Sequence, residues 1–450
     1  MNVIERVVEP GFCSGCGLCA GLCPSESLVM GFDSRKDLVP TLIGQCSRCG
    51  LCLEVCPFSG EGSGIDDIGN ERFGDVPGIS LDRVSGFYLS IWEGHSSRGD
   101  FRKRGASGGM ASWFLTRILE EGLADAVLSA GPDGSRPGIW TFIKAERAED
   151  VISQAGSVYH PVPIDRVLKK ILLEKEYKRY AVVALPCLAY GLRKAMKRLP
   201  RLKEKIVMLV SLTCGLMPNH RYSEYVSLES GVLPENMSHI NFRYPPGEAD
   251  SSNYRHVAFS RDGKQGLPVP AKGLPDLLWR HEAFIQGGCL ICDDVFGETA
   301  DAVFMDAWLP EYKKDIRGNS LVICRSPLAE KILRDGAAES ECKVREIDHE
   351  RLMQSQYETL LVKRHLLAGR LARKEEEGKS FPERRVAMDR EILDKYGKYF
   401  RFCEKLKAAI EKTRLETFED LEVFHHLIDP LLEEEMEMRL NGESPFGGNE

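Results

Sequence analysis

Cysteines repeat at a fixed spacing near the start of the chain. Of the 15 cysteines in the 450 residues, eight form two successive runs of the pattern C-x-x-C-x-x-C-x-x-x-C-P, namely Cys13, Cys16, Cys19 and Cys23 before Pro24, and Cys46, Cys49, Cys52 and Cys56 before Pro57. This spacing is typical of bacterial ferredoxins with two 4Fe–4S clusters, in which the fourth cysteine of each run binds the other cluster. The repeat therefore predicts a module that transfers electrons.

The repeat also predicts which cysteines share a cluster. One cluster is expected to be held by Cys13, Cys16, Cys19 and Cys56, and the second by Cys46, Cys49, Cys52 and Cys23. Glycines between these cysteines permit the bent backbone that such a loop needs; they are Gly15, Gly17 and Gly50. A pair of zinc sites is the alternative, but zinc usually takes two separated pairs of ligands rather than runs of four with a trailing proline.

Seven cysteines lie outside this repeat. Cys187 follows the apolar run YAVVAL, Cys214 follows IVMLVSL, and Cys289 and Cys292 form a C-x-x-C pair. If the two runs are parallel strands, both single thiols lie near the carboxyl edge of one sheet, where α/β folds place their sites. The four thiols could hold a third cluster, and buried structural cysteines or a redox C-x-x-C pair are the alternatives. Cys324 is expected to point inward from a strand, and Cys342 and Cys403 show no partner pattern.

The elements that would position these residues alternate along the chain. The apolar spacing predicts helices over 110–121 and 188–198, strands over 126–130, 180–185, 206–212, 302–306 and 320–324, and a hairpin over 256–270. Strands that alternate with helices indicate an α/β domain with a largely parallel core and some antiparallel additions.

The composition divides the chain into four parts. We expect a two-cluster ferredoxin domain over 1–60, a Gly-, Asp- and Ser-rich linker over 61–85, a mixed α/β catalytic domain over 86–350, and a charged helical extension over 351–450. The predicted fold class is therefore α+β for the small domain and α/β for the large one.

The overall composition excludes several classes of protein. Lys and Arg number 60 and Asp and Glu 68, a net charge of −8, so there is no basic excess for binding nucleic acid. The longest apolar stretches, 180–192 and 206–218, are too short and too interrupted to insert in a membrane. No secretory signal pattern begins the sequence. We therefore expect a cytoplasmic protein whose clustered cysteines bind metal or carry redox chemistry.

A glycine-rich segment precedes the helix predicted over 110–121. It reads Arg104-Gly105-Ala106-Ser107-Gly108-Gly109. Small residues leave backbone N–H groups exposed at the positive end of a helix, so an anionic group could dock there. A simple turn and helix cap is the alternative.

Taken together, these segments resemble the coenzyme F420 hydrogenase/dehydrogenase beta-subunit family, a group of flavin- and iron–sulfur-containing oxidoreductases. The resemblance covers about residues 85–330 and runs through 105–109 with its helix, 121–127 (EGLADAV), 156–159 (GSVY), 185–187 (LPC), 191–193 (GLR), 214–215 (CG), the C-x-x-C-D motif over 289–293, and 300–301 (AD). The sequence departs from the family pattern after Asp306, where it reads AWLPEYKKDIRGNS. The rim of the site and the choice of substrate therefore stay open.

The resemblance implies a non-covalently bound FAD, one 4Fe–4S cluster in the large domain, and hydride exchange with a substrate. The implied ligands of this third cluster are Cys187, Cys214, Cys289 and Cys292, and the implied FAD contacts are Ser107, Gly108, Gly109, Ser157 and Tyr159. No nucleophile and base with supporting spacing stand out, so the catalytic residues stay unassigned. Basic residues before the glycine-rich segment could bind the anionic groups of F420, and three histidines could donate protons; these are Arg98, Arg102, Lys103 and Arg104, and His95, His160 and His281.

The resulting hypothesis is an oxidoreductase subunit that couples hydride transfer between coenzyme F420 and FAD to one-electron transfer through 4Fe–4S clusters. Its expected partner is a redox protein such as a hydrogenase, formate dehydrogenase or heterodisulfide-reductase-like subunit. One alternative is a ferredoxin-dependent reductase of another small organic substrate with the same fold. A second alternative is a flavin-free electron-transfer or scaffold subunit.

Overall fold

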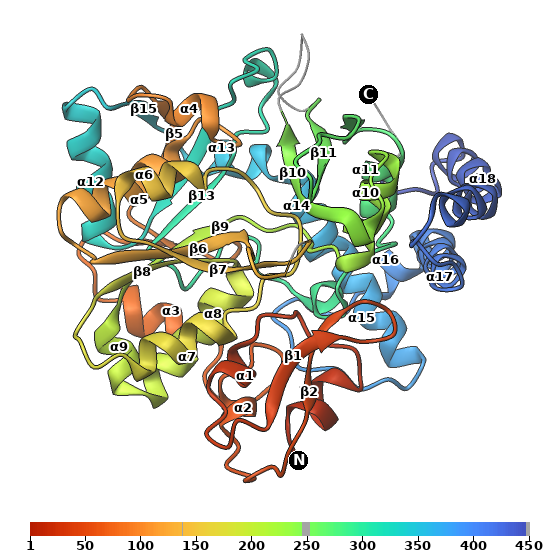
Figure 1. Cartoon of the computed structure of the whole chain (residues 1–450), viewed down its shortest axis with the longest axis horizontal. Helices are drawn as coiled ribbons and strands as arrows, with labels where there is room; N and C mark the ends of the chain where they lie inside the picture. The colour runs from red at the N-terminus through yellow and green to blue at the C-terminus, as the bar shows by residue number, and fades with distance from the viewer. Residues whose placement is uncertain (137, 245–252, 447–450) are drawn as a thin grey trace.

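A mixed sheet of eight strands forms the centre of the computed structural model, which describes residues 1–136, 138–244 and 253–446 (Figure 1). Its order is β15-β5-β14-β13-β9-β8-β6-β7. The strands are β5 (Ser90–Ser96), β6 (Ala126–Pro132), β7 (Trp140–Ala145), β8 (Tyr180–Ala184), β9 (Ile206–Leu212), β13 (Ala302–Asp306), β14 (Ser320–Cys324) and β15 (Cys342–Glu346). The four middle strands β13, β9, β8 and β6 pair in parallel, and the outer pairs are antiparallel. The predicted α/β class, with a parallel core and antiparallel additions, is confirmed.

Helices cover both faces of this sheet because alternate strand residues are buried on opposite sides. Val127 and Ala181 pack with α5 and α12, whereas Leu128 and Val182 pack with α7 and α8. The covering helices are α4 (Phe101–Arg104), α5 (Met110–Glu120), α6 (Ala148–Ser153), α7 (Asp165–Leu173), α8 (Pro186–Arg198), α9 (Pro200–Lys205) and α12 (Pro327–Ala338). The helices expected over 110–121 and 188–198 are present as α5 and α8, and Cys324 is buried from β14 as expected.

The N-terminal residues form a small unit beside α7 and α8 (Figure 1). It contains the π-helical turn η1 (Ile4–Val8), the short helices α1 (Leu18–Gly21) and α2 (Leu51–Glu54), and the antiparallel pair β1 (Leu28–Phe32) and β2 (Leu38–Leu42). Gly191 of α8 permits a close approach to this unit, since a Cβ there would lie 2.3 Å from Leu18 Cδ1. Lys194 of the same helix donates to the carbonyl oxygens of Cys56 and Glu61 at 2.8 and 2.6 Å.

The segment 61–85, expected as a linker, contains regular structure. It forms α3 (Ile65–Phe73) and β3 (Ser80–Asp82), which pairs with β4 (Gly86–Tyr88). Ile68 and Phe73 are buried. Because these two apolar side chains are removed from solvent on folding, the segment packs on the large sheet unit despite its Gly-, Asp- and Ser-rich composition.

A second, three-stranded sheet stands next to the carboxyl end of β13. It has the order β10 (Met237–Tyr244), β11 (Arg255–Ser260) and β12 (Val269–Pro270), and the hairpin expected over 256–270 is its β11–β12 part. Helices α10 (His220–Glu229) and η2 (Pro234–Asn236) lie beside it, and α11 (Leu274–Arg280) packs in the same core through Leu278. Two further short turns, η3 (Gly287–Ile291) and η4 (Pro310–Tyr312), lie elsewhere in the large unit.

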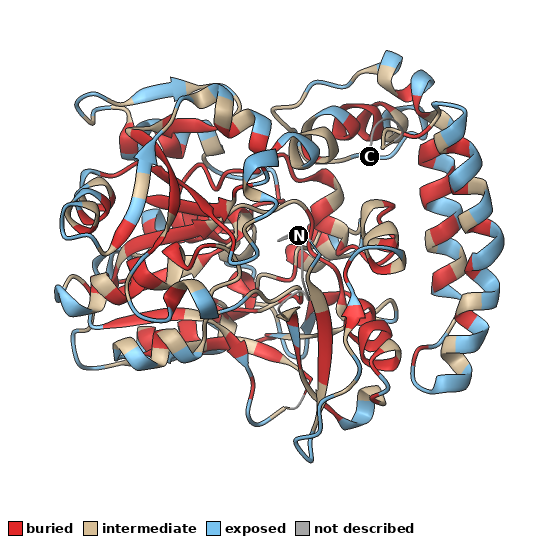
Figure 2. Cartoon of the chain, turned by 90° about the horizontal axis from the view of Figure 1, so that it is seen from above, coloured by how far each residue is buried: buried red, intermediate tan, exposed pale blue. Residues whose placement is uncertain are grey.

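The chain after residue 350 is helical in its described part, apart from connecting segments. Its elements are α13 (His349–Ser355), α14 (Tyr357–Leu360), the π-helical turn η5 (Leu361–His365), α15 (Leu366–Glu376), α16 (Arg390–Lys395), α17 (Gly397–Glu411) and α18 (Phe418–Leu440). Phe424 and Ile428 of α18 are buried with Tyr225 of α10. At the right of Figure 2 the α17–α18 pair has buried residues on one side and exposed residues on the other. No helix in the described ranges is long and apolar enough to cross a membrane.

One buried carboxylate connects α8, α3 and the start of β13. Asp301 accepts hydrogen bonds from Arg193 at 2.8 Å, Arg72 at 2.9 Å and the backbone N–H of Leu209 at 2.8 Å. Burial alone would raise the pKa of Asp301, but Arg193 and Arg72 lower it. The two arginines therefore hold the carboxylate in its ionised form within the core.

We expect Asp301→Asn to lower the free energy of unfolding by about 3–5 kcal/mol, because it leaves Arg193 buried without a counter-charge. Urea denaturation at neutral pH measures this loss. Because the pKa of Asp301 is lowered on folding, its contribution exists above the pKa of an unfolded aspartate, about 3.9, and disappears as the pH falls further.

The difference in free energy of unfolding between wild type and Asp301→Asn should therefore shrink in acid. Asp335→Asn is the matched control, since Asp335 pairs with Lys331 on the surface and its loss should cost less than about 1 kcal/mol. An Asp301→Asn protein as stable as wild type would contradict the stabilising role of this cluster.

Candidate functional site

A cavity of about 510 Å³ lies at the carboxyl ends of the parallel strands. Strands β8, β9 and β13 each end at its wall, with Leu185, Leu212 and Asp306 among the lining residues. The glycine-rich segment, the loop over 154–162 and the start of α8 form further parts of the wall. Five cysteines also line it: Cys16, Cys187, Cys214, Cys289 and Cys292. The cavity therefore collects the four cysteines expected to hold the third cluster and one cysteine of the N-terminal repeat.

The glycine-rich segment leads into α5 in a conformation that requires glycine. Gly108 and Gly109 have φ of +65° and +71°, and a Cβ on Gly109 would lie 2.3 Å from the carbonyl oxygen of Phe101. Ser107 donates its hydroxyl to the carbonyl oxygen of Asn319 at 2.5 Å. The segment is thus fixed against the start of β14, and Ala111 and Ser112 of the first turn of α5 line the cavity.

The residues predicted to contact FAD differ in their placement. Ser107, Gly109, Ser157 and Tyr159 line the cavity, whereas Gly108 is buried and is not one of the lining residues. Burial raises the pKa of Tyr159, so its phenol is neutral at physiological pH. Gly108 instead serves the turn, since a Cβ there would lie 2.9 Å from the backbone nitrogen of Ser320.

The structure brings together the four cysteines of the large unit. Cys187 lies in the first turn of α8, Cys214 follows β9, Cys289 lies in η3, and Cys292 comes directly after it. Burial raises the pKa of Cys187, and the neighbouring thiols of Cys292, Cys289 and Cys214 raise it further. Burial also raises the pKa of Cys214 to about 11. Two buried and two half-buried thiols on one cavity wall form a donor set suited to a cluster that needs thiolates.

A second thiol set lies next to this one. The pKa of Cys19 is raised by burial and also by the nearby thiols of Cys16, Cys13, Cys56 and Cys52. The assignment of Cys13, Cys16, Cys19 and Cys56 to one cluster stays a prediction. Burial raises the pKa of Cys56 to about 12. Cys16 also contributes to raising the pKa of Cys187. The two thiol sets therefore adjoin, with Cys16 and Cys187 on the shared wall of the cavity.

The remaining thiols of the repeat lie farther out. Burial raises the pKa of Cys52, and so do Cys49 and Cys46, while Cys49 is exposed. Cys23 Sγ lies 3.5 Å from Ser25 Oγ, and its membership of this set stays a prediction. Among the described residues no three His, Cys, Asp or Glu side chains are placed to hold a single metal ion. A 4Fe–4S cluster does not require such convergence, because each thiolate binds a different iron.

Sequence reasoning missed a lysine at the third thiol set. Lys363 of η5 is buried, and its Nζ donates to Cys292 Sγ at 3.1 Å and to the carbonyl oxygen of Asp294 at 2.6 Å. Burial alone would lower the pKa of Lys363, but Cys292, Cys214 and Asp294 raise it, so the side chain is an ammonium ion. Nothing local marks this residue, because it lies in a charged helical run far along the chain from Cys292.

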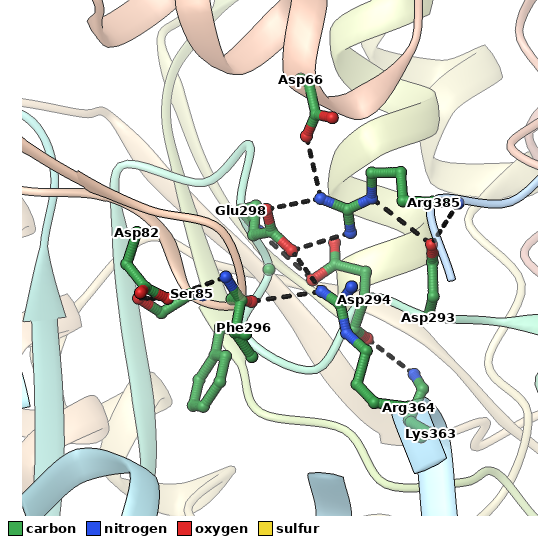
Figure 3. A network of polar contacts seen from close by, with 12 residues as sticks. Asp66, Asp82, Ser85, Asp293, Asp294, Phe296, Glu298, Lys363, Arg364 and Arg385 are labelled. Carbon is green, nitrogen blue, oxygen red and sulfur yellow. Dashed lines mark hydrogen bonds and ion pairs between the residues drawn. The ribbon is translucent and has the colours of Figure 1, made fainter. Parts of the chain in front are cut away.

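A network of ion pairs fixes the loop that follows Cys292 (Figure 3). Arg385 donates to Glu298 at 2.7 and 2.8 Å and to Asp293 at 3.4 Å, and Arg364 donates to Glu298 at 3.2 Å. Both arginines come from the helical extension. Burial alone would raise the pKa of Asp293, but Arg385 and Arg364 lower it. The extension therefore holds the loop that carries part of the third thiol set.

Aromatic residues form another part of the cavity wall. Trp308, from the segment that departs from the family pattern, lines the cavity together with Tyr254 and Trp279. Arg243 is stacked over Tyr254 at 4.2 Å and over Trp308 at 5.6 Å, and it pairs with Asp306. These flat side chains provide surfaces on which a planar ring system could stack.

The other candidates from the sequence are placed less favourably. None of Arg98, Arg102, Lys103 and Arg104 lines the cavity; Arg98 pairs with Glu120, and Arg102 pairs with Asp315. His160 does line it, but its two ring nitrogens contact the carbonyl oxygen of Pro161 and His220. His95 contacts Asn319, and the buried His281 contacts Glu435 at 3.1 Å.

Comparison with known proteins identifies a family for the large sheet unit. Two family models, for the N-terminal and the C-terminal parts of the coenzyme F420 hydrogenase/dehydrogenase beta subunit, match residues 91–169 and 177–350 respectively. The chain is 25% identical over 256 residues to the coenzyme F420 hydrogenase subunit beta of Methanothermobacter thermautotrophicus, covering 56% of this chain and 82% of that protein. It is 29% identical over 194 residues to the coenzyme F420-dependent sulfite reductase of Methanocaldococcus jannaschii, covering 42% of this chain and 26% of that protein.

A solved structure shares the fold. A chain of the F420-reducing NiFe hydrogenase complex from Methanosarcina barkeri superimposes with a TM-score of 0.51 at 19% identity, covering 67% of this chain and 98% of that one. The two family models together match more than half of the chain. The chain is therefore an oxidoreductase that belongs to the coenzyme F420 hydrogenase/dehydrogenase beta-subunit family.

Proposed function

We propose that this chain is an iron–sulfur flavoprotein subunit that couples hydride exchange between coenzyme F420 and FAD to one-electron transfer through three 4Fe–4S clusters. The observation that carries the proposal is the shared cavity, whose wall includes the glycine-rich segment before α5 and thiols of two cysteine sets. The names of the matched family and of the two relatives above all refer to coenzyme F420. When bound, FAD would supply exchange of electrons in pairs as hydride or singly, and the clusters would carry single electrons.

Different parts of the cavity wall would bind different parts of FAD. The first N–H groups of α5 have no partner within the helix, so this helix end would bind the pyrophosphate of FAD. Ser107, Gly109, Ser157 and Tyr159 would contact the rest of the cofactor from the cavity wall, while Gly108 would shape the turn. The apolar part of the wall excludes water from the reacting ring.

The three thiol sets would form a path from the cavity to the surface. Cys187, Cys214, Cys289 and Cys292 would hold the cluster beside the flavin. Cys13, Cys16, Cys19 and Cys56 would hold the next one, which the proximity of Cys16 to Cys187 supports. Cys46, Cys49, Cys52 and Cys23 would hold the outer one, where the exposed Cys49 supports contact with a partner.

The partner and the division of the chain are part of the same proposal. We propose a cytoplasmic assembly with a hydrogenase, formate dehydrogenase or heterodisulfide-reductase-like subunit. The proposed domains are a ferredoxin domain over 1–60, a connecting segment over 61–85, a catalytic domain over 86–350 and a helical extension over 351–450. The named relatives include a hydrogenase subunit and a sulfite reductase, which supports a redox protein as the partner.

Counting of iron and flavin after anaerobic purification tests the proposal. We expect about 12 iron atoms per chain, four for each of three clusters, together with one FAD. About eight iron atoms would refute the third cluster, and zinc without iron would refute all three. Full iron without flavin would favour the electron-transfer or scaffold alternative. Full cofactor content without oxidation of reduced F420 would favour another organic substrate.

A further inference from the structure

The helical extension places one buried cation on the third thiol set. Lys363 is 2% exposed and lies in η5 (Leu361–His365), past residue 350, where the family match ends. Its Nζ is 3.1 Å from Cys292 Sγ. A π-helical turn is rare and occurs often at functional sites, since it shifts the side chains that follow it.

The position of this ammonium group is fixed from several sides. Its second contact is the carbonyl oxygen of Asp294 at 2.6 Å, in the same loop that Cys292 begins. The next residue, Arg364, pairs with Glu298 at the end of this loop, and Arg385 pairs with both Glu298 and Asp293 (Figure 3). Lys363 is thus held against the sulfur by its own contact with the ligand loop and by the ion pairs of its neighbour.

Other buried lysines are used differently. Lys194, which lies near the first N-terminal thiol set, donates to the carbonyl oxygens of Cys56 and Glu61 rather than to a sulfur atom. Contact between Nζ and a thiol is therefore not required to bury a lysine in this protein.

We propose that Lys363 is a positioning residue that raises the reduction potential of a 4Fe–4S cluster held by Cys187, Cys214, Cys289 and Cys292. This inference rests on the proposed function, which supplies that cluster. Uptake of one electron adds a negative charge, and a cation with a hydrogen bond to a ligand sulfur stabilises the reduced state. The effect is large in a buried site because the surroundings screen charge poorly. The extension would therefore set how readily the cluster beside the cavity accepts an electron.

A redox titration of the full-length holoprotein, followed by the electron paramagnetic resonance signal of each reduced cluster, tests this inference. For Lys363→Met we expect the equilibrium constant for one-electron reduction of this cluster to fall at least tenfold, a shift of about 59 mV to lower potential. Lys363→Arg keeps the charge and should shift the potential less. The signals of the N-terminal clusters should change little in either variant.

Lys205→Met is the matched control. Lys205 is also a buried lysine, but its Nζ donates to the carbonyl oxygen of Glu176 at 3.2 Å rather than to a thiol, so its loss should leave the potential unchanged. Equal potentials in wild type and Lys363→Met would overturn the inference, and so would an equal shift in Lys205→Met, since loss of any buried ammonium group rather than contact with Cys292 would then be the cause.

Iron content distinguishes failure of the proposed function from failure of the inference about Lys363. A wild-type protein with about eight iron atoms would mean that the third cluster, and thus the proposed function, is wrong. A full iron content with an unshifted potential would refute only the role of Lys363. If Lys363→Met loses four iron atoms while Lys363→Arg keeps them, the requirement for a cation at Cys292 is supported. Loss in both variants would contradict it.

Discussion

Replacement of Cys289 by alanine is expected to slow electron transfer from the cavity to the N-terminal clusters. The iron content should fall from about 12 to about eight atoms per chain, because one of four thiolates of the third cluster is removed. Reduced F420 should still bleach the flavin absorbance. The rate at which it reduces the N-terminal clusters should fall by more than the roughly 10–100-fold typical of residues around a metal site, since a direct ligand is lost. Rapid freezing followed by electron paramagnetic resonance measures that rate.

Cys324→Ala is the control for this experiment. Like Cys289, Cys324 is buried, and it lies in β14, within the apolar layer against α5 and α12. Its loss should leave iron content and transfer rate unchanged. Unaltered transfer in Cys289→Ala would contradict a path through the third thiol set, and equal damage in Cys324→Ala would indicate a general loss of folding.

Filling the cavity at Ser157 is expected to exclude the flavin while leaving the clusters in place. Ser157 lines the cavity from the loop between α6 and α7, and the indole of Ser157→Trp would occupy space needed by FAD. We expect the affinity for FAD to fall more than tenfold, or about 1.4 kcal/mol. Flavin released by denaturation and iron content, measured on one preparation, report the two effects separately.

A tryptophan at a nearby exposed position provides the comparison. Ser153 ends α6 and is exposed, and it does not line the cavity. Ser153→Trp should keep both flavin and iron. If Ser157→Trp retains wild-type affinity for FAD, the cavity is not the flavin site and the contacts proposed for Ser157 and Tyr159 are wrong.

Local patterns predict the parts of this molecule that depend on neighbouring residues in the chain. The buried apolar runs of β8 and β9 are sufficient to indicate strands, and the sequence places Cys187 and Cys214 at one sheet edge only if these strands are parallel. The structure meets that condition, since β8 and β9 pair in parallel. The strands β5, β7 and β15 are not evident from the sequence. Their polar residues are mixed with apolar ones because these strands are antiparallel or lie toward the sides of the sheet.

The parts that sequence reasoning missed depend on distant contacts. Lys363 and Arg385 look like ordinary charged residues of a solvated helical run, and only the fold brings them to the loop after Cys292. The glycine-rich segment is recognisable in the sequence, but Gly108 is required by its positive φ and its closeness to Ser320 rather than by contact with the cavity. Likewise α3 forms where composition indicates a linker, because its buried apolar side chains pack on the large unit.

Anaerobic mixing of the oxidised holoprotein with one equivalent of reduced F420 tests the central claim most directly. We expect the absorbance of oxidised F420 to appear, the flavin absorbance to bleach, and reduced-cluster signals to follow as the two electrons of one hydride are distributed singly. The claim would be contradicted if the clusters and flavin were present and reducible by a chemical reductant, yet reduced F420 remained unoxidised.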